Sequence, residues 1–244
     1  SIVCGRKTLT KDMISIIEEL AIDEWEKGDY EPSFNIAPTQ NSPVLINKRG
    51  SRIVRMMKWG LIPHWSKDSS RASRMINARS ETLLQKISYK DLVYSKRCII
   101  ISDGYFEWKK HGKRKIPYYM HHPEKTLLLM AGLWTSWRSS STIISTYTVI
   151  TTTPNKNIAH IHDRMPAILN KNDVDTWLNC DTKDNIRIVL NYLRPFSGPL
   201  SYHPVSNFVN SLMLLLRWRI ILLKFSYSFC NDFANKSIIF SVTF

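Results

Sequence analysis

Short β-rich runs follow one another from Pro43 to Thr152, each separated from the next by turn residues, and this pattern limits the fold more than any other feature. Many short strands predict an antiparallel or mixed sheet curled into a barrel. With flanking helices this gives a single α+β domain with a β-barrel-like core. The predicted strands cover residues 44–46, 53–59, 97–102, 117–121, 127–133 and 146–152.

Helices are expected on both sides of these strands. Thr10 can cap a helix over about 11–26, in which Ile14, Ile17 and Trp25 help to form one apolar face. Two more helices and a last strand are predicted at 171–178, with Asn170 as a cap candidate, at 182–193, and at 200–205.

The segment 211–244 does not continue the pattern of residues 1–210, which we expect to be one domain. It is apolar and basic, with no clear periodicity. A transmembrane helix would place Arg217 and Arg219 near its centre, which makes a membrane location unfavourable. A basic interfacial helix, a disordered tail and a C-terminus altered by a frameshift are the other interpretations.

Charge and cysteine usage limit the partners and the compartment. In the 244-residue chain, Lys and Arg outnumber Asp and Glu by 34 to 20, which favours an acidic partner such as nucleic acid. The four cysteines form no C-x-x-C pair and no metal-ligand cluster, and nothing at the start resembles a signal peptide. We therefore expect a cytoplasmic protein.

Cys4 is the first candidate for chemistry. A free N-terminal cysteine has an amine that can form a Schiff base with an aldehyde and a thiol that can then close a thiazolidine ring. Within a longer chain, the same residue is more often an ordinary exposed cysteine.

Three further blocks carry polar groups suited to such chemistry. Asn77 offers an amide that can orient a substrate, and Arg79 offers a fork for a phosphate, although either residue could cap a loop. Glu107 lies between two aromatic residues, so partial desolvation would raise its pKa and suit a general acid. It could instead point outward and pair with a lysine.

The block around His162 supplies a histidine for proton transfer. His160 lies two residues earlier, on the same face of an extended strand, but no third ligand has suitable spacing, so no metal and no other cofactor is expected. Arg164 is a second candidate phosphate contact. Tryptophans interleaved with basic residues are typical of proteins that hold single-stranded nucleic acid.

Seven short blocks in this order resemble the SOS response-associated peptidase (SRAP) family over about Cys4–Asn210. They are CGR at 4–6, FNIAP at 34–38, WGLIP at 59–63, NARSET at 77–82, DGYFEW at 103–108, HIHDRMP at 160–166 and HPVS at 203–206.

The resemblance implies a protein that binds single-stranded DNA and forms a thiazolidine crosslink with an abasic site, thereby shielding the lesion, and we expect it to be a monomer. It implies that Cys4 is the nucleophile and that Asn77 positions the abasic sugar. Glu107 would be the acid and base, and His162 would assist ring opening and reversal. Arg79 and Arg164 would bind phosphates, while Pro38 and Trp65 would form an apolar wedge beside the lesion.

Ser1-Ile2-Val3 precedes Cys4, so its nitrogen is an amide in the sequence as written. A GTG start codon written as Val3 would place the native start at position 3, and removal of that residue would free the amine. Self-cleavage of a short leader is the other route, consistent with the peptidase name.

Two alternative functions remain open from the sequence. One is a module that holds single-stranded DNA without covalent chemistry. The other is a thiol peptidase that uses Cys4 and His162 on other proteins.

Overall fold

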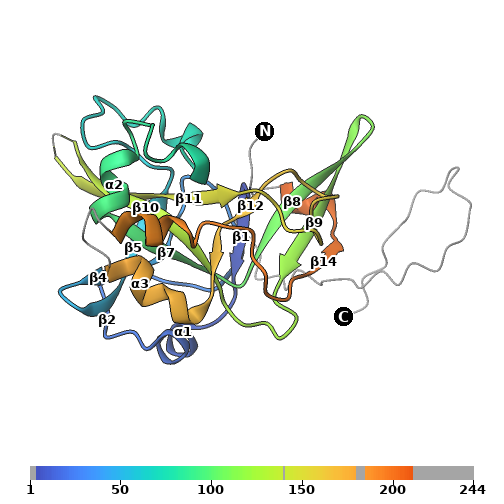
Figure 1. Cartoon of the computed structure of the whole chain (residues 1–244), viewed down its shortest axis with the longest axis horizontal. Coiled ribbons are helices and arrows are strands. Elements are labelled where there is room, and N and C mark those ends of the chain that lie inside the picture. Colours follow the sequence, from blue (N-terminus) through green and yellow to red (C-terminus); the bar gives the residue numbers. More distant parts are fainter. Residues whose placement is uncertain (1–3, 140, 180–184, 211–244) are drawn as a thin grey trace, which may run out of the picture.

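Five strands close into a barrel. The structure, a computed structural model, describes residues 4–139, 141–179 and 185–210. The predictions for residues 1–3 and 211–244 therefore lie outside the described part of the chain. The barrel strands are β4 (Asn41–Lys48), β5 (Ser51–Trp59), β7 (Arg97–Ser102), β10 (Leu128–Arg138) and β11 (Ile143–Thr152). They pair in the order β11-β10-β7-β4-β5, and a parallel pairing of β11 with β5 closes the ring (Figure 1).

The barrel interior explains the apolar sequence of these strands. All six residues of β7 are buried, as expected for a strand covered on both faces. In β10, a Cβ on Gly132 would lie 2.1 Å from Ile100 Cδ1 and 2.6 Å from the Thr148 carbonyl oxygen. Only glycine therefore fits at this point, where β10 passes between β7 and β11.

A second sheet of five strands lies beside the barrel, on the right in Figure 1. Its order is β14 (Ser201–Pro204), β9 (Arg114–His121), β8 (Gly104–His111), β1 (Arg6–Leu9) and β3 (Ser33–Ile36). All of its pairings are antiparallel. This sheet joins the start of the described chain to β8, the strand that contains Glu107.

Short strands and helices complete the single α+β domain, and the expected fold class is confirmed. In Figure 1, α1, α2 and α3 lie on the barrel side of the molecule. The smaller elements are α1 (Met13–Leu20), α2 (Lys90–Ser95), α3 (Val174–Asn179), α4 (Ile186–Leu190), β2 (Glu24–Trp25), β6 (Asn77–Arg79), β12 (Met165–Pro166) and β13 (Ile168–Leu169).

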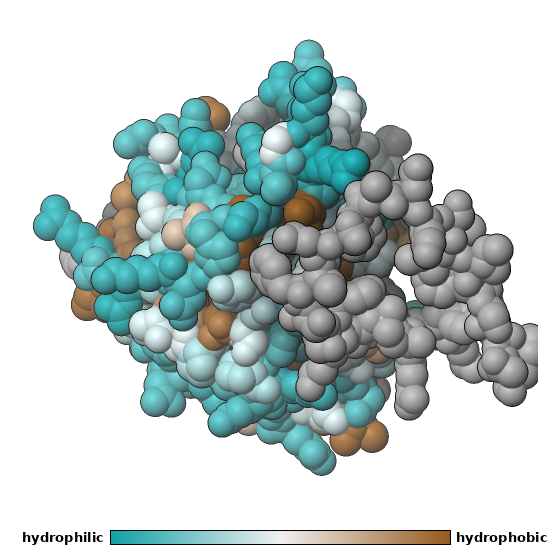
Figure 2. All heavy atoms as spheres, turned by 90° about the vertical axis from the view of Figure 1, so that its right-hand side faces the viewer, coloured by the Kyte–Doolittle hydropathy of each residue, from teal (hydrophilic) through white to brown (hydrophobic). Residues whose placement is uncertain are grey.

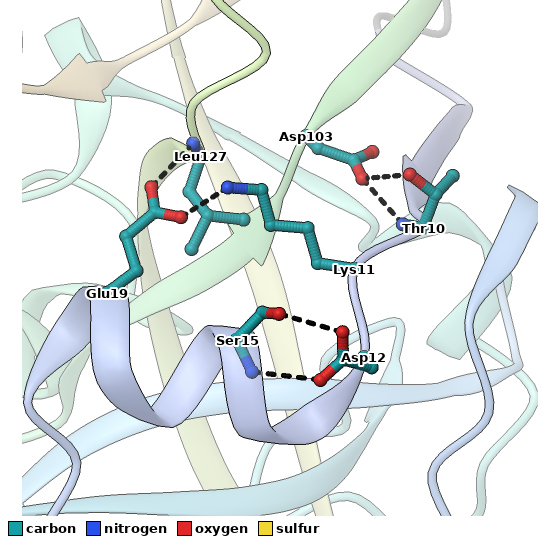
Figure 3. Close-up of polar contacts among 7 residues, drawn as sticks. All are labelled: Thr10, Lys11, Asp12, Ser15, Glu19, Asp103 and Leu127. Carbon is teal, nitrogen blue, oxygen red and sulfur yellow. Dashed lines mark hydrogen bonds and ion pairs between the residues drawn. The ribbon is translucent and has the colours of Figure 1, made fainter.

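The first helix differs from its prediction at both ends. Asp12, not Thr10, caps α1 by accepting a hydrogen bond from the Ser15 N–H at 2.9 Å (Figure 3). The amide and hydroxyl of Thr10 instead donate to Asp103 at 2.5 and 2.6 Å. The helix ends at Leu20 because Ala21 is left-handed, with a φ of 48°, and the chain then forms β2 instead of continuing to residue 26.

The later elements agree more closely with their predictions. A 3₁₀ turn at Lys171–Asp173 and α3 together cover the helix predicted at 171–178, but Asn170 makes no side-chain cap hydrogen bond. Helix α4 covers only the centre of the helix predicted at 182–193, part of which lies outside the described residues. Strand β14 matches the last predicted strand within one residue at each end.

Candidate functional site

Cys4 and Glu107 meet through a direct hydrogen bond. The backbone N–H of Cys4 donates to Glu107 Oε1 at 2.5 Å. Cys4 is 0% exposed and Glu107 1% exposed, so the contact is shielded from solvent. The residues are 103 positions apart in the chain, and the pairing of β1 with β8 brings them together.

Side chains alternate between the two faces of β8, and this alternation determines the face to which the Glu107 side chain points. In β8, Phe106 packs against Tyr119 with ring centroids 5.0 Å apart, whereas Tyr105 belongs to the main core on the opposite face. Glu107 lies two residues after Tyr105 and points to the same side. The alternative in which Glu107 points outward to a lysine is therefore wrong.

Burial controls the protonation of this pair. It raises the pKa of Glu107 well above its ordinary value, while the Cys4 N–H acts in the opposite direction. Glu107 Oε2 is buried and has no hydrogen-bond partner among the described residues. Burial, and then the nearby Glu107, also raise the pKa of the Cys4 thiol, whereas Lys7 lowers it.

His162 lies in the loop that leads into β12, and this loop approaches the Cys4–Glu107 pair. The charge of Asp163 is close enough to Glu107 to contribute to its raised pKa. Burial lowers the pKa of His162. Its Nδ1 lies 3.1 Å from the Arg164 backbone nitrogen, which donates to it, and 3.0 Å from Asp163 Oδ1. His160 lies in a turn, not on an extended strand, and its ring contacts Tyr202 instead.

An ion pair ties the His162 loop to the segment that contains Asn77. Arg164 binds both carboxylate oxygens of Glu81 at 2.6 and 2.9 Å and donates to the Thr151 carbonyl at 2.6 Å. Glu81 follows β6, and Asn77 opens β6 opposite Val149 of β11. The guanidinium of Arg164 is therefore already paired with a carboxylate, whereas Arg79, at the end of β6, is exposed.

Pro38 and Trp65 lie at the same end of the β4–β5 hairpin. Pro38 precedes β4, and the Thr39 N–H donates to the Trp59 carbonyl at 2.8 Å. Trp65 follows β5 with 49% of its surface exposed. Figure 2 shows the right-hand side of Figure 1, where the described surface is mainly hydrophilic with scattered apolar residues.

Sequence patterns did not identify Lys7 as part of this site. Lys7 lies in β1 and is 0% exposed, and its charge interacts with the Cys4 thiol. The segment RKTL has no apolar alternation that would indicate a buried strand. The sequence feature that could have identified Lys7 is its position only three residues after Cys4.

The fold and the site define a single-domain α+β protein whose N-terminal strand holds a buried cysteine against a buried carboxyl group. The family model described as SOS response associated peptidase (SRAP) matches residues 3–212, so the chain belongs to this family and the resemblance is confirmed.

Similar proteins include relatives from bacteria and vertebrates. The chain is 39% identical over 213 residues to the abasic site processing protein YoqW of Bacillus subtilis (strain 168), covering 86% of this chain and 95% of that protein. It is 35% identical over 225 residues to the abasic site processing protein HMCES of Xenopus tropicalis, covering 77% of this chain and 66% of that protein. A crystal structure of a Bacteroides thetaiotaomicron protein superimposes with a TM-score of 0.75 at 25% identity, covering 84% of this chain and 93% of that one.

Proposed function

We propose that this protein processes abasic sites in single-stranded DNA by forming a thiazolidine between Cys4 and the ring-opened sugar. The observation that carries the proposal is the buried hydrogen bond from the Cys4 nitrogen to Glu107 Oε1, at 2.5 Å. It holds the nitrogen that would attack the aldehyde beside a carboxyl group whose pKa is raised. The names of the relatives support the choice of substrate.

The chemistry requires an amine, an acid and a thiol in sequence. The Cys4 amine attacks the aldehyde carbon, and the carbinolamine loses water when Glu107 donates a proton to the departing oxygen. The thiol sulfur then bonds to the carbon of the C=N group, the π electrons become a lone pair on nitrogen, and the thiol proton departs. His162 can donate a proton to the sugar oxygen during ring opening, and Asn77 orients the sugar.

We assign DNA binding to other groups of the proposed site. Arg79 is exposed and free to contact a phosphate, while Arg164 would act together with its partner Glu81. Trp65 and Pro38 would support the unstacked strand beside the lesion. The β8–β9 hairpin adds basic residues that extend from the strand of Glu107.

Covalent reaction requires a free amine on Cys4. We propose that the preceding residues are removed, by processing or by autoproteolysis. Intact mass of the natively expressed protein checks this point. A persistent Ser-Ile-Val extension on protein that still crosslinks would contradict the thiazolidine.

Incubation with an abasic-site oligonucleotide, followed by denaturing electrophoresis, tests the function. We expect a denaturation-resistant band with a chain that starts at Cys4 and none with Cys4→Ala. Cys98→Ala is the matched control, because Cys98 is equally buried but lies in β7, and it should retain the band.

The other outcomes identify the alternatives. Retention of DNA by Cys4→Ala under native conditions, with no covalent band from any variant, would indicate a binding module. Cleavage of peptides in trans that depends on Cys4 and His162 would indicate a thiol peptidase.

A further inference from the structure

The Arg164 guanidinium is held at three points by groups of the protein itself. It donates to both carboxylate oxygens of Glu81, at 2.6 and 2.9 Å, and to the Thr151 carbonyl oxygen at 2.6 Å. The arginine side chain is 12% exposed and the glutamate side chain 48% exposed. Two parallel hydrogen bonds between a guanidinium and a carboxylate fix orientation as well as distance, unlike most ion pairs at a protein surface. The guanidinium therefore has one defined position.

This ion pair lies at the end of β11, where two short strands flank it. Thr151 of β11 is paired with Arg79 of β6 on one side and with Pro166 of β12 on the other. Glu81 lies in the 3₁₀ turn that follows β6, and Arg164 comes directly before β12. The ion pair therefore joins the segment after β6 to the His162 loop across the end of β11.

The backbone of Arg164 in turn contacts the His162 ring. The Arg164 N–H donates to His162 Nδ1 at 3.1 Å, and Asp163 Oδ1 lies 3.0 Å from the same ring nitrogen. The Asp163 side chain is 82% exposed, whereas Arg164 is anchored to Glu81. A continuous path of contacts thus runs from the Glu81 carboxylate through Arg164 to the imidazole. The orientation of the His162 ring therefore depends on where Glu81 holds Arg164.

We propose that Glu81 is a positioning residue for His162. By binding the Arg164 guanidinium, it keeps the Arg164 N–H against the imidazole and so holds the ring in place for proton transfer to the sugar. The inference rests on the proposed function. The charge of Glu81 supports this role, because a carboxylate beside Arg164 opposes the approach of a DNA phosphate to the same guanidinium. An anchoring role and a phosphate-binding role for Arg164 therefore predict different effects of removing the Glu81 charge.

The first test compares the rate of reaction with the affinity for DNA in Glu81→Gln, which keeps the side-chain shape and removes the charge. Single-turnover crosslinking to an abasic-site oligonucleotide should slow about tenfold, a part of the roughly 10²–10⁴-fold that a general acid contributes. Affinity for the same oligonucleotide with an intact base should not weaken, because that DNA makes no use of His162. A tighter affinity with an unchanged rate would assign Arg164 to a phosphate and overturn the inference. Glu124→Gln, exposed in the turn after β9, should change neither quantity.

The second test needs no DNA and follows the contact with His162 directly. Hydrogen exchange of the Arg164 amide, measured by NMR, should be faster in Glu81→Gln than in the wild type, because that amide loses its fixed place on the imidazole. The Ala167 amide, which donates to the Ile150 carbonyl at 2.9 Å, should exchange as before and show that the fold is intact. Unchanged exchange at Arg164, or faster exchange with an unchanged crosslinking rate, would overturn the inference. Faster exchange together with no crosslink from any variant, the wild type included, would overturn the proposed function alone.

Discussion

At the scale of single residues, the proposed site contains a carboxyl group whose pKa is raised by burial. Glu107 is buried, one of its oxygens accepts the Cys4 N–H, and the other has no hydrogen-bond partner among the described residues. A carboxyl group with a raised pKa carries a proton that it can donate. It also destabilises the fold when it ionises, because the charge lacks solvation.

Glu107→Gln should separate these two effects. The unfolding free energy of the wild type should fall as pH rises above 4.5, the ordinary glutamate value, because the folded state keeps a proton that the unfolded state loses. The glutamine does not titrate, so this decline should be absent, while crosslinking slows about 100-fold or more. Denaturant unfolding at several pH values and single-turnover gels measure the two quantities. Glu18→Gln, on the exposed side of α1, is the control, and equal pH profiles for wild type and Glu107→Gln would contradict the prediction.

Local sequence indicated some of these residues and could not indicate others. Glu107 is desolvated as expected, but not by its aromatic neighbours, because Phe106 and Trp108 pack on the other face of β8. Lys7 was missed because burial of β1 comes from contacts with β4 and β7, which are distant in the chain. The Arg164–Glu81 ion pair was also missed, because its two residues are distant in the chain. The local sequence around an arginine does not show whether the arginine binds a phosphate or a carboxylate.

At the scale of elements, the β8–β9 hairpin places like charges opposite one another. Lys110 pairs with Lys115, and Gly112 and Lys113 form the turn. Residues 109–116 include no acidic residue. Like charges directly opposite in a sheet are destabilising, so the hairpin retains a repulsion that a polyanion would relieve.

Replacing Lys110, Lys113 and Lys115 by glutamine should have opposite effects on binding and stability. If each lysine neutralises one phosphate, the slope of log affinity against log salt should become shallower by about 2 for single-stranded DNA. Loss of the cross-strand repulsion should stabilise the fold by about 0.2–1 kcal/mol. Salt titrations with a labelled oligonucleotide and thermal melting measure both. Glutamine at Lys86 and Lys90, outside the hairpin, is the comparison, and an equal loss of slope there would argue against a role for the hairpin.

Strands were predicted better than helices. The bounds of β7 were predicted correctly from its apolar run, because a strand buried on both faces has a continuous hydrophobic sequence. The helix at 11–26 was too long because the apolar period continues into β2, where Trp25 packs on the core as part of a strand. Nothing in the local sequence indicates that the backbone of Ala21 is left-handed.

At the scale of the whole molecule, ring closure joins strands that are remote in sequence. The parallel contact between β5 and β11 closes the barrel, and β6 pairs with β11 beyond it. The position of Asn77 therefore depends on how β10 and β11 pack. Across the described residues, no helix is long and apolar enough to cross a membrane.

Gly132→Ala tests this dependence. The new methyl group would overlap Ile100 and the Thr148 carbonyl oxygen, so β11 has to move away from β10. We expect a loss of about 1–3 kcal/mol in unfolding free energy, as is typical of overpacking. The substitution should also slow crosslinking, because β6 moves with β11. Ser136→Ala, exposed on the same strand, should melt like the wild type, and an unchanged melting temperature in Gly132→Ala would show that the barrel has spare room.

The complete burial of Cys4 also bears on how lesions would be told apart from intact DNA. A sulfur atom with no exposed surface can be reached only by a narrow group. A sugar that has lost its base is the slimmest unit in a strand, whereas an intact nucleotide brings a bulky flat ring. Discrimination would then come from steric exclusion, and damage of any base would be accepted equally, since the base is the part that must be missing.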